Sequence, residues 1–369
     1  METAPTSLAI IAGARPNFMK VAPLMHALSA DPAIKPILIH TGQHYDHNMS
    51  GQFFQDLGIA EPDYHLEVGS GSHAAQTAEI MKRLEPVLLE SKPAGLIIVG
   101  DVNSTVAGAL VAKKLGIDVI HIEAGLRSFD RTMPEEINRI VTDSISDLLL
   151  VTEESGRANL LREGVAESRI HLVGNLMIDT LRRHRDQALK SGVQARLGIE
   201  PGAAYGLVTL HRPANVDDPE QLGKILSALS EIAQELPLYW PMHPRTRSTV
   251  ARLPLSERIH ILEPLGYIEF LAMQAGSRVV LTDSGGIQEE TTVLGVPCLT
   301  LRDNTERPVT IDAGTNRLAG TSRESILKAW AEHRANPKKG QEPPLWDGKA
   351  GERCHAVLRR HFLEGASNG

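Results

Sequence analysis

Three carboxylates follow predicted strands or begin a predicted helix, the positions where α/β enzymes usually carry their catalytic residues. Asp101 follows the apolar run 96–99 after a single glycine, Glu123 follows the run 118–122, and Glu135 comes directly after Pro134 at the start of a helical pattern. Because the carboxyl ends of parallel strands meet at one edge of a sheet, Asp101 and Glu123 are expected to face one crevice, with Glu135 nearby. Carboxylates crowded in this way can act as acid and base. Taken singly, Asp101 also fits a helix N-cap and Glu135 a helix-dipole partner.

A second group of residues is suited to an anion. Residues 281–290 read LTDSGGIQEE, which predicts a buried strand and then a helix that begins at Ser284, Gly285 and Gly286. The free backbone N–H groups of such a helix start bind phosphate without a cationic side chain. Glu290, about a turn further on, could accept hydrogen bonds from ribose hydroxyls. The alternative is an ordinary capped helix with glycines for tight packing.

Cationic side chains and histidines follow other strand ends. Arg15 and Lys20 lie at the entrance of the helix after the first strand, where they could meet an anionic ligand or simply be solvated. His211 and His243 each follow a strand, with an arginine one or two residues further on, which suits diphosphate contact or proton transfer. The run 41–47, TGQHYDH, has no recognised ligand spacing, so no metal site is expected there.

The rest of the chain predicts a scaffold of parallel strands for these residues. Short apolar runs alternate with longer helical patterns, as in βαβ units. The expected strands form two groups: 7–12, 36–40, 96–99, 118–122 and 147–151, then 206–209, 238–240, 259–262, 278–281 and 297–300. We therefore expect an α/β fold of two Rossmann-like, doubly wound parallel-sheet domains that face a central cleft.

The domain boundaries are expected in the polar helical stretch between the two groups of strands. The N-terminal domain is predicted to cover residues 1–176, with a C-terminal helix, 352–369, packing back on it, and the second domain to cover 177–351. Residues 182–185 of the connecting stretch read RRHR, which we interpret as a solvated helix face.

Composition excludes several classes of protein. The chain has 369 residues, more than one hydrophobic core usually organises, which again favours two domains. A net charge of -7 disfavours a nucleic-acid binder. The two cysteines lack a CxxC spacing, so neither a disulfide framework nor a thiolate zinc site is indicated. No targeting segment or membrane-length apolar run is evident, and a cytoplasmic location is expected. Neither GxGxxG nor GxxxxGK[ST] occurs, which disfavours a bound nicotinamide and P-loop chemistry.

A series of motifs, taken in order, resembles one known family, the non-hydrolysing UDP-N-acetylglucosamine 2-epimerases. The match extends over nearly the whole chain, and ten motifs in series with fitting spacing are far more specific than one. The motifs are GARPNFMK (13–20), TGQH (41–44), GD (100–101), HIEAGLRS (121–128), MPEEINR (133–139), VGN (173–175), TLHR (209–212), HPR (243–245), TDSGGIQEE (282–290) and TERP (305–308).

The resemblance implies a fold, an activity and a mechanism. The fold is the two-domain architecture shared with GT-B glycosyltransferases, the assembly is a homodimer, and no redox cofactor or metal is used. An enzyme carboxylate removes the C2 proton of the UDP-sugar while the C1–O bond to UDP breaks, giving 2-acetamidoglucal and UDP. Re-addition of UDP with protonation on the other face inverts C2. The product, UDP-N-acetylmannosamine, would supply cell-surface polysaccharide synthesis.

The resemblance also implies roles for individual residues. The family's catalytic acids fall on Asp101, Glu123 and Glu135, and its catalytic histidine on His211. Its substrate and UDP contacts fall on Arg15, Lys20, His243, Phe270, Ser284, Gly285, Gly286, Glu290 and Arg307. Two departures put further contacts in doubt, because the family's frequent HRRE is here HRPA (211–214) and its frequent RPE is RPV (307–309).

Other functions remain open at this stage. Close relatives act on a UDP-2,3-diacetamido uronic acid, in which the position of Arg307 tends to be apolar, so an arginine here favours N-acetylglucosamine. Hydrolysing relatives release free N-acetylmannosamine. A glycosyltransferase of the same architecture would need an acceptor. A non-catalytic sugar-nucleotide sensor would lack the acids.

Many bacterial members of the family are activated by UDP-N-acetylglucosamine bound beside the active site. The residues that match this effector-side site are Gln43, His44, Gln76, Thr77, Arg212 and His243. However, Ala75 stands where the family has an arginine, and Asp46 where it has a second glutamine. Since a guanidinium clamps a diphosphate through charge-assisted hydrogen bonds, its loss predicts weak or absent effector dependence.

Overall fold

The computed structural model describes residues 4–364 apart from residues 14, 43–53, 55–56 and 243. The chain divides into two compact units, one of Met1–Thr180 with Pro344–Gly369 and one of Leu181–Pro343. Each unit is an α/β structure, and every strand pairing in the described ranges is parallel. This confirms the predicted fold class of two doubly wound parallel sheets.

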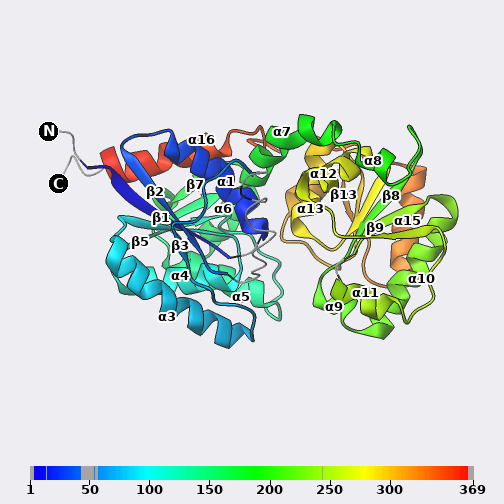
Figure 1. The fold of residues 1–369 in the computed structure, drawn as a ribbon, viewed down its shortest axis with the longest axis horizontal. Helices are drawn as coiled ribbons and strands as arrows, with labels where there is room; N and C mark the ends of the chain where they lie inside the picture. The colour runs from blue at the N-terminus through cyan, green and yellow to red at the C-terminus, as the bar shows by residue number, and fades with distance from the viewer. Residues whose placement is uncertain (1–3, 14, 43–53, 55–56, 243, 365–369) are drawn as a thin grey trace. The chain divides into compact units, whose positions relative to one another are not determined.

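The first unit contains a seven-stranded sheet with helices on both faces (Figure 1). Its strands are β1 Thr6–Ala12, β2 Ile34–His40, β3 Tyr64–His65, β4 Gly95–Val99, β5 Asp118–Ile122, β6 Leu148–Val151 and β7 Ile170–Leu172. Its helices are α1 Arg15–Ser29, α3 His73–Ser91, α4 Asn103–Lys114, α5 Pro134–Ile145, α6 Glu154–Arg162, η1 Glu167–Arg169, α16 Ala350–Arg359 and η2 Arg360–Glu364, and α7 Leu176–Leu189 continues into the second unit.

The order of the strands creates one point where the direction of winding reverses. The sheet runs β3-β2-β1-β4-β5-β6-β7, so the chain moves outward from β1 in one direction and then returns to start again at β4. In open α/β sheets, ligands bind at the carboxyl ends of the strands beside such a switch point. The segments after β1, β4 and β5 are therefore the candidate site of this unit.

Alternate residues of the strands pack under different helices. Ala9, Ile11, Leu96 and Ile98 face α3 and α4 in one apolar cluster, and all four are at most 3% exposed. Figure 1 shows α3 and α4 side by side on this face, and α1 with α16 on the other. Full burial of such side chains contributes about 1.5–3 kcal/mol each, which makes the sheet a rigid base for the residues at its edge.

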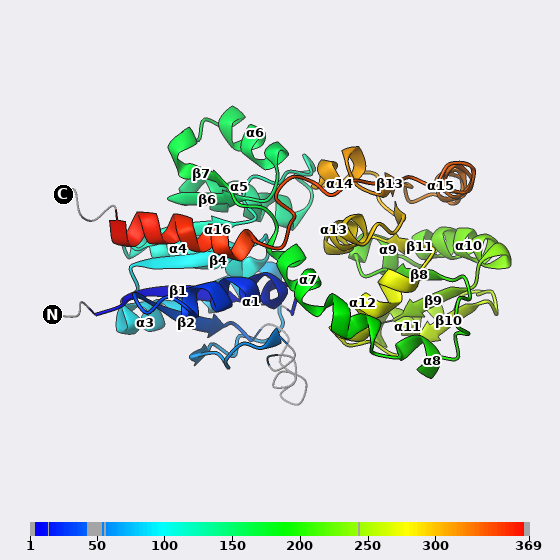
Figure 2. The same cartoon turned by 90° about the horizontal axis from the view of Figure 1, so that it is seen from above.

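The C-terminal segment of the chain is part of the first unit. The Asp179 carboxylate accepts hydrogen bonds from the N–H groups of Ala350 (3.1 Å) and Gly351 (2.8 Å) at the start of α16. Trp346, which is 1% exposed, donates from its indole nitrogen to the carbonyl oxygen of Thr152 at 3.1 Å. Consequently α16 lies against α1, as both views show (Figure 2).

The second unit contains a six-stranded sheet in the order β10-β9-β8-β11-β12-β13, with the switch point between β8 and β11. Its strands are β8 Gly206–Thr209, β9 Leu238–Pro241, β10 Ile259–Leu262, β11 Val279–Thr282, β12 Cys298–Thr300 and β13 Asn316–Leu318. Its helices are α8 Val193–Arg196, α9 Pro213–Val216, α10 Pro219–Glu235, α11 Pro244–Val250, α12 Tyr267–Gly276, α13 Gly285–Leu294, α14 Pro308–Asp312 and α15 Arg323–Ala335.

Two apolar layers hold this sheet. Val208, Trp240 and Leu281 belong to the cluster beneath α10 and α15, whereas Leu207 and Val280 belong to the cluster beneath α12 and α13. This alternation along β8 and β11 is the period of two expected for strands that are buried on both faces. The carboxyl ends of β8 and β11 are thus fixed beside each other.

The structure differs from the sequence-based expectation in two respects. All ten predicted strands overlap observed ones, but β3, β7 and β13 were not predicted. Each of these has two or three residues, and each is the edge strand of its sheet. In the RRHR stretch the three arginines are exposed, as predicted, but His184 is only 7% exposed and packs edge-on against Tyr267, with ring centroids 6.2 Å apart.

Candidate active site

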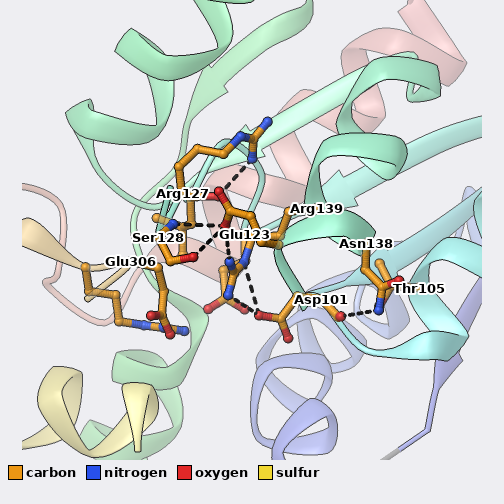
Figure 3. A network of polar contacts seen from close by, with 12 residues as sticks. Asp101, Thr105, Glu123, Arg127, Ser128, Asn138, Arg139 and Glu306 are labelled. Carbon is orange, nitrogen blue, oxygen red and sulfur yellow. Dashed lines mark hydrogen bonds and ion pairs between the residues drawn. The ribbon is translucent and has the colours of Figure 1, made fainter. Parts of the chain in front are cut away.

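In the first unit, Asp101 directly follows β4 and Gly100, at the switch point. Its carboxylate Oδ2 accepts hydrogen bonds from Nη2 (2.6 Å) and Nε (3.1 Å) of Arg139 on α5. Its carbonyl oxygen accepts from Nδ2 of Asn138 at 2.8 Å. The Arg139 side chain is 2% exposed and that of Asp101 is 28% exposed. Arg139 therefore orients the carboxylate (Figure 3), which stays partly exposed to solvent.

Arg139 also connects Asp101 to the loop before α5. Its Nη1 donates to Oε2 of Glu136 at 2.6 Å, and Glu136 is 1% exposed. The Glu136 carboxylate in turn accepts from the backbone N–H groups of Ser128 (2.9 Å) and Phe129 (3.0 Å). Phe129 has a φ of +60°, a left-handed conformation that is unfavourable for an aromatic residue. These hydrogen bonds stabilise that conformation.

Glu123 follows β5 and is 5% exposed, with a φ of +70°. Its carboxylate forms an ion pair with the ammonium group of Lys20 on α1. A methyl group at Gly100 would lie 3.3 Å from Oε2 of Glu123 and 3.7 Å from Nζ of Lys20. Gly100 itself has a φ of +74°, so it both makes the turn after β4 and leaves room for this pair. The contact brings Glu123 beside the segment that carries Asp101.

Glu135 lies in the first turn of α5, after Pro134 at its first position. Its side chain is half-buried and makes no hydrogen bond or ion pair with any residue in the described part of the chain. Since α5 also carries Asn138 and Arg139, which hold Asp101, the two candidate acids are connected through this helix. Asp101 is not a helix N-cap, because the N-cap of α4 is Val102. Glu135 does lie in the first turn of α5, as its alternative role of helix-dipole partner requires.

A fully buried histidine, His121, holds the turn after β4 in place. His121 Nδ1 lies 2.6 Å from Oδ1 of Asp143, and its Nε2 lies 2.8 Å from the carbonyl oxygen of Gly100. Asp143 also pairs with Arg127 Nη1 at 2.7 Å. Burial opposes the charged form of Asp143, but His121 and Arg127 outweigh it and hold the pKa of this carboxyl below its ordinary value. The network fixes the turn on which Asp101 stands.

In the second unit, α13 begins at Gly285, immediately after β11 and the switch point. Its N-cap residue, Ser284, makes no side-chain capping hydrogen bond, which contradicts the capping half of the alternative interpretation. The other half, glycine for tight packing, is confirmed at Gly285, where an added methyl group would collide with Arg307. The first backbone N–H groups of a helix have no partner within the helix. Gly285 and Gly286 therefore present N–H groups, with the positive end of the helix dipole, to a ligand anion.

Three arginines lie near this helix start. Arg307 is 6% exposed and donates from Nε to Glu289 (2.5 Å) and from Nη1 to Glu306 (2.6 Å). Glu306 also contacts Nη2 of Arg302 at 2.8 Å and Nη2 of Arg212 at 3.5 Å. A side chain at Gly285 would collide with the guanidinium of Arg307. Glycine is thus needed at this position for the arginine to lie against the start of α13.

Glu290 is fully buried on α13. Burial raises the pKa of its carboxyl to about 7, although Nε2 of Gln274, which donates at 2.6 Å, favours the charged form. Such a carboxyl changes protonation in the neutral range and can respond to a ligand hydroxyl. Phe270, on α12, is half-buried and packs against the apolar cluster beneath that helix.

His211 follows β8 at the same switch point. Its side chain is 59% exposed, and its Nδ1 lies 3.1 Å from Oδ1 of Asp283, which is fully buried. The Asp283 carbonyl oxygen accepts from Nε of Arg212 at 3.0 Å. Asp283 therefore joins the candidate histidine to the turn at the start of α13.

Several predicted residues are placed only in part. Arg15 is the first residue of α1, but its side chain, with His243, Gln43 and His44, lies outside the described part of the chain. Gln76 is 7% exposed on α3, where it donates to the Gly69 carbonyl oxygen (3.1 Å) and accepts from Asn103 (2.7 Å).

Residues that hold the catalytic candidates were missed by the sequence analysis. Glu136, Arg139, Asp143, Asp283 and Glu306 lie in or beside the quoted motifs, yet only their tertiary contacts reveal what they do. In the described ranges, no group of three or more His, Cys, Asp or Glu side chains could hold a metal ion. None of the helices in these ranges combines the length and apolar character needed to cross a membrane.

Comparison with known proteins places the chain in one family. The sequence profile of the family described as UDP-N-acetylglucosamine 2-epimerase matches residues 26–359. The UDP-N-acetylglucosamine 2-epimerase of Methanocaldococcus jannaschii is 44% identical over 361 residues, covering 95% of this chain and 98% of the relative. The UDP-2,3-diacetamido-2,3-dideoxy-D-glucuronate 2-epimerase of Pseudomonas aeruginosa is 41% identical over 322 residues, covering 86% and 90%.

A solved structure of a family member has the same fold. The crystal structure of the M. jannaschii enzyme in complex with UDP-GlcNAc and UDP superimposes with a TM-score of 0.88 at 44% identity, covering 96% of this chain and 99% of that one. The resemblance seen in the motifs, the two parallel-sheet units and these matches all agree. The chain belongs to the UDP-N-acetylglucosamine 2-epimerase family.

Proposed function

We propose that the protein is an isomerase that interconverts UDP-N-acetylglucosamine and UDP-N-acetylmannosamine by inverting C2. The observation that carries the proposal is the set of carboxylates at the switch point of the first unit, where Asp101 and Glu123 are held by Arg139 and Lys20. A protein that only binds a nucleotide sugar has no need of such acids. The 44% identity to the M. jannaschii 2-epimerase supports the same reading.

The proposed reaction begins with an elimination. A carboxylate takes the C2 proton, the C–H electron pair becomes the C1=C2 double bond, and the C1–O bond breaks with its electrons on the departing UDP. This coupling is needed because C2–H has no adjacent carbonyl and is too weak an acid to leave alone. In the second step UDP adds back to C1 of the 2-acetamidoglucal, while a second acid delivers a proton to the opposite face of C2. No electrons are gained or lost overall, so the chemistry itself needs no redox cofactor.

Asp101, Glu123 and Glu135 supply the acids and bases for these proton transfers. Asp101 and Glu123 each have a cationic partner that favours the carboxylate, whereas Glu135 has none in the described ranges, so the three differ in environment. Groups in different environments can serve as base and as acid in one site.

The second unit holds UDP as a leaving group that must also return as a nucleophile. The start of α13 would hold the diphosphate, beside Arg307, which Glu289 and Glu306 hold against that helix start, and Glu290 would accept the ribose hydroxyls. Because these donors are fixed before the reaction, they stabilise negative charge as it develops on the β-phosphate. His211, which follows β8 at the same switch point, assists the departing oxygen.

The direct test is proton NMR of the purified protein with UDP-N-acetylglucosamine in D2O. Deuterium should enter at C2, and a UDP-N-acetylmannosamine signal should appear without added NAD or metal. A glycosyltransferase would leave C2 protonated. Free N-acetylmannosamine as the main stable product would move the protein to the hydrolysing group.

Replacement of the acids tests the assignment residue by residue. Asp101→Asn, Glu123→Gln and Glu135→Gln should each lower kcat by about 100-fold or more, as loss of a positioned acid or base does, with a smaller effect on substrate affinity. The matched control is Glu154→Gln, an exposed acid at the start of α6, which should keep wild-type turnover. Near-normal kcat in any of the three would show that its role is structural.

A second candidate substrate has specific support. The Pseudomonas relative that is 41% identical is named for a UDP-diacetamido-glucuronate. In favour of N-acetylglucosamine, this chain has Arg307, where the uronic-acid enzymes tend to be apolar. A side-by-side assay with both nucleotide sugars should show turnover of UDP-N-acetylglucosamine, and turnover of the uronic acid alone would reverse the choice.

The proposal also covers the oligomeric state and the cellular location. We propose that the protein is a homodimer and acts in the cytoplasm, as the family resemblance implies. Light scattering after gel filtration should give twice the mass of the 40.1 kDa chain. A mass of one chain at micromolar concentration would refute the dimer.

A further inference from the structure

Asp283 is a buried acid whose role the proposed mechanism does not use. It stands between β11 and α13, directly before Ser284, and none of its side chain is exposed. Its two carboxylate oxygens accept from the backbone N–H groups of His211 (3.1 and 3.2 Å) and Arg212 (3.0 Å). Oδ2 also accepts from Nδ2 of Asn215 at 3.1 Å. A fourth group, Nδ1 of His211, lies 3.1 Å from Oδ1.

These contacts keep Asp283 ionised. Burial by itself raises the pKa of this carboxyl, but the contacts from His211, Arg212 and Asn215 outweigh it and hold the pKa below the ordinary value. An ionised carboxylate only accepts hydrogen bonds. The contact therefore favours a hydrogen on Nδ1 of His211, the ring nitrogen that lies 3.1 Å from Oδ1. In the neutral ring that hydrogen is the only one, so Nε2 is left as an acceptor.

We infer that Asp283 is a positioning residue for His211: its carboxylate holds the Nδ1–H hydrogen of the imidazole and thereby makes Nε2 the nitrogen that serves the reaction. The inference rests on the proposed function and deepens it. A carboxylate that orients an imidazole and fixes its tautomer is a recurrent device for a histidine that exchanges protons with substrate.

The same residue links this histidine to the anion site. Ser284, Gly285 and Gly286 follow Asp283 directly, so its main chain enters the turn that would bind the diphosphate while its side chain holds His211. The His211 ring is 59% exposed, which leaves it accessible to a ligand at that turn. With a proton on Nε2, His211 donates a hydrogen bond to the departing diphosphate oxygen, and Asp283 balances the positive charge of the ring.

A purely structural role for Asp283 is the competing explanation. Three of its four partners are not the imidazole, so the carboxylate could simply brace residues 211–215. The two explanations differ in what they say about the ring. A brace leaves the His211 tautomer undetermined and, when removed, weakens UDP binding and turnover together.

The test is nitrogen NMR of the full-length enzyme labelled with ¹⁵N-histidine, with the His211 signals assigned by their loss in His211→Gln. With a neutral ring, the wild type should show the Nδ1–H tautomer. In Asp283→Asn, whose amide can donate as well as accept, this preference should be lost. The control is Asn215→Ala, which removes another donor to Oδ2 of the same carboxylate and should keep the wild-type tautomer. An Nε2–H tautomer in the wild type, or an unchanged tautomer in Asp283→Asn, would overturn the inference.

Kinetics supply the second readout. Asp283→Asn should lower kcat by about 100-fold while the dissociation constant for UDP, measured by calorimetry, changes less than about threefold. A parallel loss of UDP affinity and turnover would favour the brace. If Asp283→Asn does not fold, the tautomer of the wild type still decides. Because that measurement needs no substrate, it separates failure of this inference from failure of the proposed activity, which the D2O experiment reports.

Discussion

Replacing Arg139 should lower both the stability of the first unit and the turnover, and a second substitution should then restore only the stability. The buried guanidinium stands between Asp101, whose side chain is 28% exposed, and Glu136, which is buried. Arg139→Met keeps the aliphatic volume but leaves the Glu136 carboxylate buried without its cation. Breaking a buried ion pair on one side costs about 3–5 kcal/mol, and the partly solvated Asp101 pair adds no more than about 1 kcal/mol.

The assay is urea unfolding, followed by the fluorescence of Trp346 in a Trp240→Phe, Trp330→Phe background. Trp346 is the tryptophan that lies in the first unit, so its signal reports on the unit that carries Arg139. Arg157→Met is the matched control. Its ion pair with Glu154 is 34% and 64% exposed, so the change should cost less than about 1 kcal/mol.

The double variant Glu136→Gln, Arg139→Met carries the decisive comparison. Removing the orphaned charge should restore about 2 kcal/mol of the lost stability, since an uncharged amide is cheaper to bury than a carboxylate. Turnover should stay about 100-fold below wild type, because Asp101 is still without the guanidinium that orients it. A single variant that loses less than about 1 kcal/mol, or a double variant with restored kcat, would refute the reasoning.

The remaining predictions concern ligand binding. Gly285→Ala should weaken UDP binding by at least about tenfold, because the new methyl group displaces the Arg307 guanidinium from the start of α13; unchanged affinity in calorimetry would mean that the diphosphate lies elsewhere. The carboxyl of Glu290, with a pKa raised to about 7 by burial, is mostly protonated at pH 6 and mostly ionised at pH 8. If its ionised form accepts the ribose hydroxyls, uridine affinity should rise over this interval, and Glu290→Gln should abolish the rise. The same raised pKa means that the folded state keeps a proton which the unfolded chain releases, so this group's contribution to stability falls as pH rises from about 4.5 to 7. Effector activation should be weak or absent, since Ala75 replaces a diphosphate-binding arginine and costs at least about tenfold in affinity. A reverse reaction from UDP-N-acetylmannosamine that stays silent until a trace of UDP-N-acetylglucosamine is added would contradict this.

Much of the fold could be predicted because buried parallel strands are continuous apolar runs. The runs at β4, β5, β8 and β11 have no other interpretation once helical patterns alternate with them. The three strands that were missed, β3, β7 and β13, are short and lie at sheet edges. An edge strand is stabilised on one side only and needs no long apolar run, so its sequence carries little signal.

The sequence by itself determined which residue types stand at the strand ends, and hence the candidate acids, the Ser-Gly-Gly helix start and the family. What it left open was the partner of each charged group. Arg139 is 38 residues from Asp101 in the chain, Lys20 is 103 residues from Glu123, and the His211 amide is 72 residues from the Asp283 carboxylate that holds it.

Only the tertiary structure decided those pairings, because doubly wound topology brings distant strand ends to one edge of a sheet. The expectation for Lys20 shows the difference most clearly. From sequence it fits a ligand anion, and in the structure its ammonium group pairs with Glu123. The sequence gives the type of each residue. Whether a buried charged group binds a ligand or pairs with a neighbouring side chain depends on which groups the fold brings within a few ångströms of it.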